Sequence, residues 1–256
     1  MKKFITNHKI LSGVSILTLL LIWYCASSLI DKPLILPSPQ SAFENLLILV
    51  ESGDFWRHLT ATISRGLTAF GISFGLSIMI GIVAGRYKWI EALLRPLLVC
   101  LRSTPSMSII LIALLWFKGE RVPLFVISLV VLPLLIQNVI EGIRNIDFEL
   151  LELLTLYRVK KSRLLLKFYI PSILPFLAAG VSNGLSLTWK VSIAAEVLAY
   201  PVWGIGTQMD TARVYLQTEK VFAWTVVVIG IGLLFDFISI FILRRSFIAW
   251  KGTEHV

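Results

Sequence analysis

Residues 147–175 read DFELLELLTLYRVKKSRLLLKFYIPSILP, and this charged stretch interrupts an otherwise very apolar chain. Its apolar residues recur at three- and four-residue steps, which predicts two short amphipathic helices. Asp147 is expected to cap the first helix, because an aspartate side chain accepts hydrogen bonds from the backbone N–H groups of a first turn. The long apolar helix that follows is expected to begin near Pro171, since proline is tolerated in the first turn of a helix.

The composition excludes an ordinary soluble domain. Hydrophobic residues make up 57% of the 256 residues and charged residues only 15%, which indicates an integral membrane protein. In a membrane protein, basic residues concentrate in the loops on one side of the bilayer. The net charge of +9 is therefore expected to reflect this distribution, and no nucleic-acid partner is expected. The sequence has no GxxxxGK[ST] phosphate-binding loop, and its three histidines (8, 58 and 255) lack metal-ligand spacing. We expect neither an enzyme nor a cofactor or metal site in this chain.

Six apolar stretches are each long enough to cross the bilayer. We expect membrane spans at about 10–30, 59–85, 96–117, 122–143, 171–198 and 221–243. They form one transmembrane domain, 10–256, with a short head at 1–9 and a charged loop at 147–170. The first stretch could instead be a signal peptide, but it is long for one, so an uncleaved span is favoured.

Other features of the spans suggest how they are connected and packed. Residues 86–95 are expected to form a basic turn, and Pro105 is expected to break the third span. The small-residue pairs Gly71-xxx-Gly75 and Gly81-xxx-Gly85 would let the second span approach its neighbours closely. Packing within the chain is favoured over a dimer seam for these glycines.

The distribution of basic residues predicts the orientation in the membrane. Six spans put both termini on one side, and 15 of the 24 Lys and Arg residues fall on that side, against six on the other and three within spans. Because positive residues concentrate in cytoplasmic loops, both termini and the loop 147–170 are expected in the cytoplasm.

A cytoplasmic loop of amphipathic helices, in a chain without a nucleotide site, is typical of a docking element for a separate motor protein. The alternative is an interfacial loop that lies on anionic lipid through its Lys and Arg side chains.

The loop resembles the "EAA" coupling loop of binding-protein-dependent ABC importer permeases. In that pattern a glutamate precedes an Ile-Pro or Leu-Pro pair whose proline lies nineteen residues later, as Glu152 precedes Pro171 here. Leu153 and Leu154 replace the two alanines, and Arg158 occupies the glycine position. If the turn there is left-handed, arginine costs about 1–2 kcal/mol more than glycine. The resemblance implies that these five residues couple the chain to an ATPase.

Further segments look like counterparts in the nitrate/sulfonate/taurine-type branch of these permeases. They are LPSPQ (36–40), HLTATISRGLTAFGISF (58–74), RPLLVCLRSTPSMSIILIALLWF (95–117), WKVSIAAEVLA (189–199), GIGTQMDTAR (204–213) and VFAWT (221–225). The resemblance implies an all-α, MetI-like type I importer fold in the cell inner membrane. It also implies a permease homodimer, two ATPase subunits that bind ATP and Mg, and an extracytoplasmic substrate-binding protein.

The transported ligand is expected to be a nitrate-, sulfonate- or taurine-like anion or a related small organic compound. A thiamine-precursor pyrimidine or another vitamin-like ligand is the alternative within the family. A secondary transporter is a rival from another class, but we see no internal repeat in the sequence. A structural or signalling membrane protein without a transport path is the other rival.

Several polar side chains fall inside the predicted spans, where ionisable groups must be paired or hydrated. At ~1.5 Å per residue from Pro171, Lys190 lies about 28 Å and Glu196 about 37 Å along the fifth span. Glu196 could there reach Arg65 of the second span and tie two helices together. Lys190, on another face, could instead border the path and attract an anion. The candidate path or intramembrane residues are Arg65, Arg102, Asn183, Lys190 and Glu196.

Overall fold

The computed structural model describes residues 8–251, which fold into helices joined by short turns and extended segments. The predicted head, 1–9, and the last residues, 252–256, lie largely or wholly outside the described residues. The helices are α2 (His8–Ile30), α3 (Pro39–Glu51), α4 (Gly53–Arg86), α5 (Lys88–Ser103), α6 (Ser106–Trp116), α7 (Arg121–Arg144), α8 (Phe148–Leu156), α9 (Lys161–Leu164), α10 (Ile170–Ala199), α11 (Ile205–Val214) and α12 (Thr218–Lys251).

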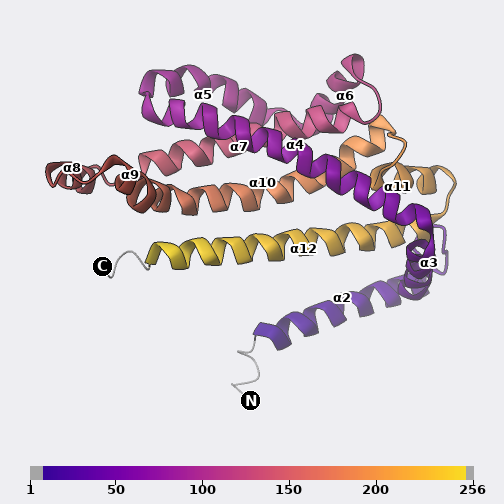
Figure 1. Cartoon of the computed structure of the whole chain (residues 1–256). Coiled ribbons are helices and arrows are strands. Elements are labelled where there is room, and N and C mark those ends of the chain that lie inside the picture. Colours follow the sequence, from indigo (N-terminus) through magenta and orange to yellow (C-terminus); the bar gives the residue numbers. More distant parts are fainter. Residues whose placement is uncertain (1–7, 252–256) are drawn as a thin grey trace.

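The long helices run roughly side by side (Figure 1). Five of the described helices are long and apolar enough to cross a membrane, and the bent pair α5 and α6 makes a sixth if it counts as one span. The predicted all-α architecture with six spans is therefore confirmed.

The third span differs in detail from the prediction. Helix α5 begins at Lys88, so most of residues 86–95, expected as a turn, are helical. The chain then bends by 96° between α5 and α6. Pro105 explains the bend, because the residue before a proline avoids the helical region and Thr104 is extended (φ −73°, ψ 125°). The segment 96–117 is thus two helices at a sharp angle rather than one straight span.

Close packing of α4 on α7 depends on two glycines. A Cβ atom added to Gly81 would lie 2.6 Å from the side chain of Val139, and one added to Gly85 would lie 3.0 Å from Ile143. The prediction that this pair serves packing within the chain is confirmed. Gly71 and Gly75 have no such neighbour within 4 Å of an added Cβ.

A second group of contacts joins α4, α6, α7 and α10. Apolar side chains from these four helices form a buried cluster at their centre. Its fully buried members include Ala69, Ile110, Val126 and Ala195. This cluster fixes α4 and α10 relative to each other.

Helix α8 projects from one end of the bundle, the end at which α12 terminates, whereas α3 and α11 lie at the opposite end (Figure 1). The Asp147 side chain accepts a hydrogen bond from the Leu150 N–H at 3.0 Å, so the predicted cap is confirmed. The predicted second short helix is not separate. α9 continues through a π-helical turn, Leu165–Tyr169, into α10. A π turn widens the backbone just before Pro171, where a regular helix would bring the proline ring against a preceding carbonyl.

The turn after α8 places Arg158 in the left-handed region, with φ of 51°. The Arg158 N–H donates to the Thr155 carbonyl at 3.0 Å and the Val159 N–H to the Leu154 carbonyl at 3.2 Å. These two bonds form a Schellman motif, whose left-handed position glycine usually occupies. The turn thus has the left-handed geometry that makes arginine costly at this position.

Replacing Arg158 with glycine should therefore stabilise the turn. We expect Arg158→Gly to slow amide hydrogen exchange across residues 153–160 by roughly 5- to 30-fold, which corresponds to about 1–2 kcal/mol. Val159→Gly is the matched control, because its backbone is not left-handed, and should speed exchange. Equal or faster exchange in Arg158→Gly would show that the left-handed turn carries no strain.

Candidate functional site

A fully buried carboxylate lies at the α11 end of the bundle. Glu196, near the end of α10, is 0% exposed and forms an ion pair with Arg65 of α4, whose side chain is 5% exposed. The Thr62 hydroxyl donates to Glu196 Oε2 at 3.0 Å. The Arg65 guanidinium also donates to the Trp203 carbonyl at 2.8 Å and lies 3.9 Å from Glu120. The carboxylate is thus both charge-paired and hydrogen-bonded, which is the condition for burying a charge.

The same carboxylate holds the start of helix α11. The Gly206 N–H donates to Glu196 Oε2 at 3.0 Å, and the Ile205 N–H donates to the Thr62 hydroxyl at 2.9 Å. The Gly204 N–H donates to His58 Nδ1 at 3.0 Å, so the neutral imidazole carries its proton on Nε2. The first N–H groups of a helix have no partner within the helix, and a carboxylate there also suits the helix dipole. Side chains of α4 and α10 therefore cap α11.

This capping arrangement leaves no room for side chains on the approaching backbone. A Cβ atom added to Gly206 would lie 2.4 Å from the Ile193 carbonyl oxygen, and one added to Gly204 would lie 2.8 Å from Glu196 Oε2. Glycine at positions 204 and 206 is thus required by the close approach of α11 to α10.

A second set of contacts fixes the loop between α10 and α11 at its surface. Tyr200 ends α10 in the left-handed conformation, with φ of 50°, and its hydroxyl donates to Asp210 at 2.8 Å. Arg213 donates to the other oxygen of Asp210 at 2.7 Å. The hydrogen bond from Arg213 holds the pKa of Asp210 below its usual value. Asp210 of α11 is thus bonded to Tyr200 at the end of α10 and to Arg213, which ties the two ends of the loop together.

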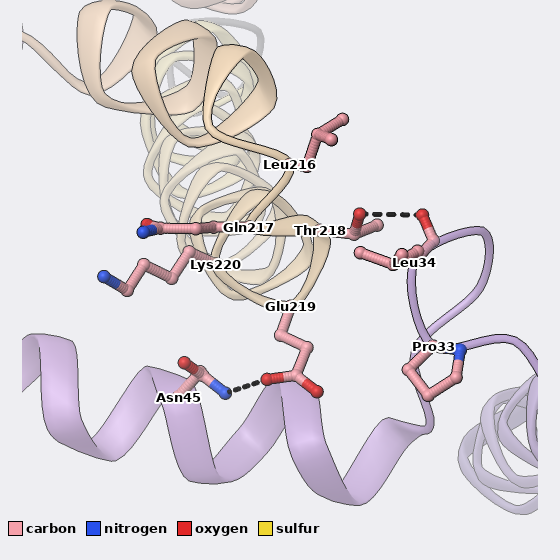
Figure 2. A pocket seen from close by; sticks show the side chains of 8 residues that line it. All are labelled: Pro33, Leu34, Asn45, Leu216, Gln217, Thr218, Glu219 and Lys220. Carbon is pink, nitrogen blue, oxygen red and sulfur yellow. Dashed lines mark hydrogen bonds between the residues drawn. The ribbon is translucent and has the colours of Figure 1, made fainter.

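A pocket of about 320 Å³ opens at the same end of the bundle (Figure 2). Its lining residues are Pro33, Leu34, Asn45, Leu216, Gln217, Thr218, Glu219 and Lys220. The Asn45 amide donates to Glu219 at 3.0 Å, and the Thr218 hydroxyl donates to the Leu34 carbonyl at 2.8 Å. These two bonds fasten the start of α12 to α3 and to the loop after α2, so the contacts around this pocket support a structural role for it.

At the opposite end, α8 exposes apolar side chains. Leu153 is 51% exposed and Leu156 is 81% exposed, while Glu152 and Arg158 are exposed and Leu154 is half-buried. Glu152 has no hydrogen-bond or ion-pair partner in the described part of the chain. A projecting helix with uncovered leucines and a free carboxylate is suited to contact another protein.

The predicted intramembrane residues fall into two groups. Arg65 and Glu196 form an ion pair, as expected if they tie the second and fifth spans together. Arg102, Asn183 and Lys190 are exposed on the chain and do not join that pair. Among the residues that the structure describes, no group of three or more His, Cys, Asp or Glu side chains could hold a metal.

Sequence reasoning missed the side chains around the ion pair, namely His58, Thr62, Gly204 and Gly206. A signal for two of them was present. His58, Thr62 and Arg65 recur at four- and three-residue steps, which places three polar side chains on one face of an otherwise apolar helix. Such a polar face in a membrane span predicts a polar partner on a neighbouring element.

The tight approach of α11 gives a test by stability. Gly206→Ala should lower the unfolding temperature of the purified protein by about 2–8 °C, because the new methyl group overpacks a backbone carbonyl. Gly230→Ala is the matched control, since an added Cβ there meets nothing within 4 Å. Alanine is the better helix former, so the control should be neutral or stabilising. Equal unfolding temperatures for the two variants would contradict the packing described here.

Comparisons with known proteins identify the family of this chain. The family model of the binding-protein-dependent transport system inner membrane component matches residues 77–247. SsuC from Escherichia coli (strain K12), whose name assigns it to aliphatic sulfonates transport, is 32% identical over 237 residues, which cover 92% of this chain and 89% of SsuC. The taurine transport system permease protein TauC of the same organism is 25% identical over 249 residues, covering 94% of this chain and 90% of TauC.

A solved structure shares the fold. The MetNI methionine ABC transporter, crystallised in inward facing conformations, matches with a TM-score of 0.56 and 17% identity, over 75% of this chain and 93% of that one. The MetNI match supports the fold alone, whereas the family model spans most of the chain. The protein therefore belongs to the family of binding-protein-dependent transport system inner membrane components, the permeases of ABC importers.

Proposed function

We propose that the chain forms the translocation path for a small anion of the sulfonate or taurine type, delivered by an extracytoplasmic binding protein. The names of similar permeases support this substrate class, because they specify aliphatic sulfonates, taurine and bicarbonate. As a permease component, the chain is not itself an enzyme, and ATP is bound by the ATPase partner. The observation that carries the coupling to that partner is the projection of α8 from the bundle (Figure 1), together with the exposure of its leucine side chains.

We place the α8 end of the bundle, and with it both termini, in the cytoplasm. The excess of basic residues on that side supports this orientation. The buried Glu196 site and helix α11 would then lie at the extracytoplasmic end, where a binding protein can reach them.

Reporter fusions test the orientation. Fusions after Val50, Gly119 and Gln208 should report an extracytoplasmic position, and fusions after Lys88 and Lys161 a cytoplasmic one. The physical reason is that loops rich in Lys and Arg are retained inside. A pair of fusions that reported the reversed locations would contradict the six-span orientation.

We propose that Glu152, Leu153 and Leu154 contact the ATPase, and that the Arg158 turn and Pro171 set the angle of α8. The apolar face of α8 would enter a groove on the partner, so its leucines would lose their exposure on assembly. ATP-driven closure of the two ATPase subunits would then move α8 and, through the continuous helix from Lys161 to Ala199, the membrane span.

Two substitutions test this contact separately. Glu152→Arg should leave the permease folded but abolish the rise in ATP hydrolysis that the binding protein causes. Leu153→Asp should weaken ATPase association by roughly 100-fold, because a charge there must be desolvated. Leu153→Met, a volume-conserving change, is the matched control and should behave as the parent protein. Full stimulation in Glu152→Arg would remove this residue from the mechanism.

We further propose a homodimer with the path at its two-fold axis, lined mostly by α5, α6, α7 and α10. The exposure of Asn183 and Lys190 within a membrane span supports it, since such side chains must be covered or hydrated in the assembly. A purified complex with one copy of this chain per two ATPase subunits would mean that a different second permease completes the path.

Lys190 is proposed to border the path and attract the anion. Lys190→Met should lower transport by roughly 10-fold through loss of electrostatic attraction, while assembly and basal ATP hydrolysis persist. Lys220→Met, which changes a lysine of the pocket in Figure 2, is the control and should leave transport unchanged. Unchanged transport in Lys190→Met, or a failure to assemble, would exclude the path role.

A further inference from the structure

An acidic side chain in the last membrane span has no role in the function described above. Asp236 lies within the apolar segment Thr218–Phe241 of α12 and is exposed on the chain. The Ser186 hydroxyl of α10 donates to Asp236 Oδ1 at 2.7 Å. Within the described residues, Asp236 has no ion-pair partner, and neither has Lys190. Two ionisable side chains therefore remain uncompensated in neighbouring spans.

The two faces of α10 differ in what covers them. Thr188 and Ser192, four residues apart, face α4. A Cβ atom added to Gly66 of α4 would lie 3.4 Å from the Thr188 side chain and 4.0 Å from the Ser192 hydroxyl. Side chains three and four residues apart share a helix face, so Ser186 and Lys190 lie together on the other side of α10. The hydrogen bond from Ser186 places Asp236 beside this uncovered face.

The surface between α10 and α12 thus carries a cation and a carboxylate at membrane depth. Ionisable groups in a membrane face water or protein rather than lipid, because a charge in hydrocarbon costs several kcal/mol. On the single chain this surface is uncovered, since Asp236 and Lys190 are both exposed. Either water or the second copy must therefore lie against it in the assembly.

We propose that α12 lines the translocation path through Asp236, the carboxylate that accepts the hydrogen bond from Ser186. The inference rests on the proposed transport function and adds the sixth span to a path assigned above to the third to fifth spans. A carboxylate near Lys190 weakens the positive potential of the path, so a small anion attracted by the lysine is held only weakly. Conduction requires such weak binding.

Cysteine accessibility tests the proposal without knowledge of the ligand. The native cysteines, Cys25 and Cys100, are both exposed, so the background is Cys25→Ser/Cys100→Ser. In it, Asp236→Cys is compared with Leu234→Cys, a 54% exposed position on the opposite side of α12. The assembled complex in nanodiscs is treated with a charged, membrane-impermeant methanethiosulfonate, and modification is followed by mass spectrometry. Ile240→Cys, one turn from Asp236 on the same face, tests the surface with the carboxylate intact.

Because the thiolate that reacts forms only in water, Asp236→Cys and Ile240→Cys should be modified about tenfold faster than Leu234→Cys. Lys190→Cys separates this inference from the proposed path. If Lys190→Cys reacts and neither α12 position does, α12 does not line the path and the path itself stands. If no position on this surface reacts in an assembled complex, both proposals are wrong. If Asp236→Cys prevents assembly, rapid modification of Ile240→Cys alone supports a path lined by α12.

Discussion

The burial of the Glu196 carboxylate is the constraint on which the α11 end of this permease depends. The side chain is wholly inaccessible, and it is satisfied by Arg65, Thr62 and the Gly206 N–H together. Removing one partner of a buried ion pair typically costs about 3–5 kcal/mol, because the other charge remains unpaired. The capped start of α11 and the ion pair between α4 and α10 depend on this one charge, in addition to the apolar packing that holds the helices together.

The opposite end of the molecule is built differently. Helix α8 is held by its own cap and by its Schellman turn, while its leucines remain uncovered. Between the two ends, helical structure is continuous from Lys161 to Ala199, which connects the loop after α8 to Glu196, the residue that holds α11. The two ends are joined by the turn after α8 and one long helix, an arrangement that fits the proposed transmission of force from the ATPase.

Local and one-dimensional features could be predicted from the sequence. The Asp147 cap depends on a single turn, the spans depend on length and hydropathy, and the Arg65–Glu196 pair followed from helical rise alone. The extension of α5 back to Lys88 and the π turn before Pro171 could not be predicted, because clustered basic residues and proline usually mark the ends of membrane helices. The capping of α11 by Thr62 and His58 joins residues more than 140 positions apart, and only the tertiary fold reveals it.

This chain is the membrane component of a binding-protein-dependent ABC importer, and its coupling to the ATPase through α8 is our proposal. The most direct measurement is ATP hydrolysis by the permease reconstituted in nanodiscs with its ATPase, as liganded binding protein is added. The rate of ATP hydrolysis should rise with the concentration of liganded binding protein and then saturate. The proposed coupling would be contradicted if the permease bound no ATPase, or if hydrolysis by the assembled complex did not respond to the binding protein.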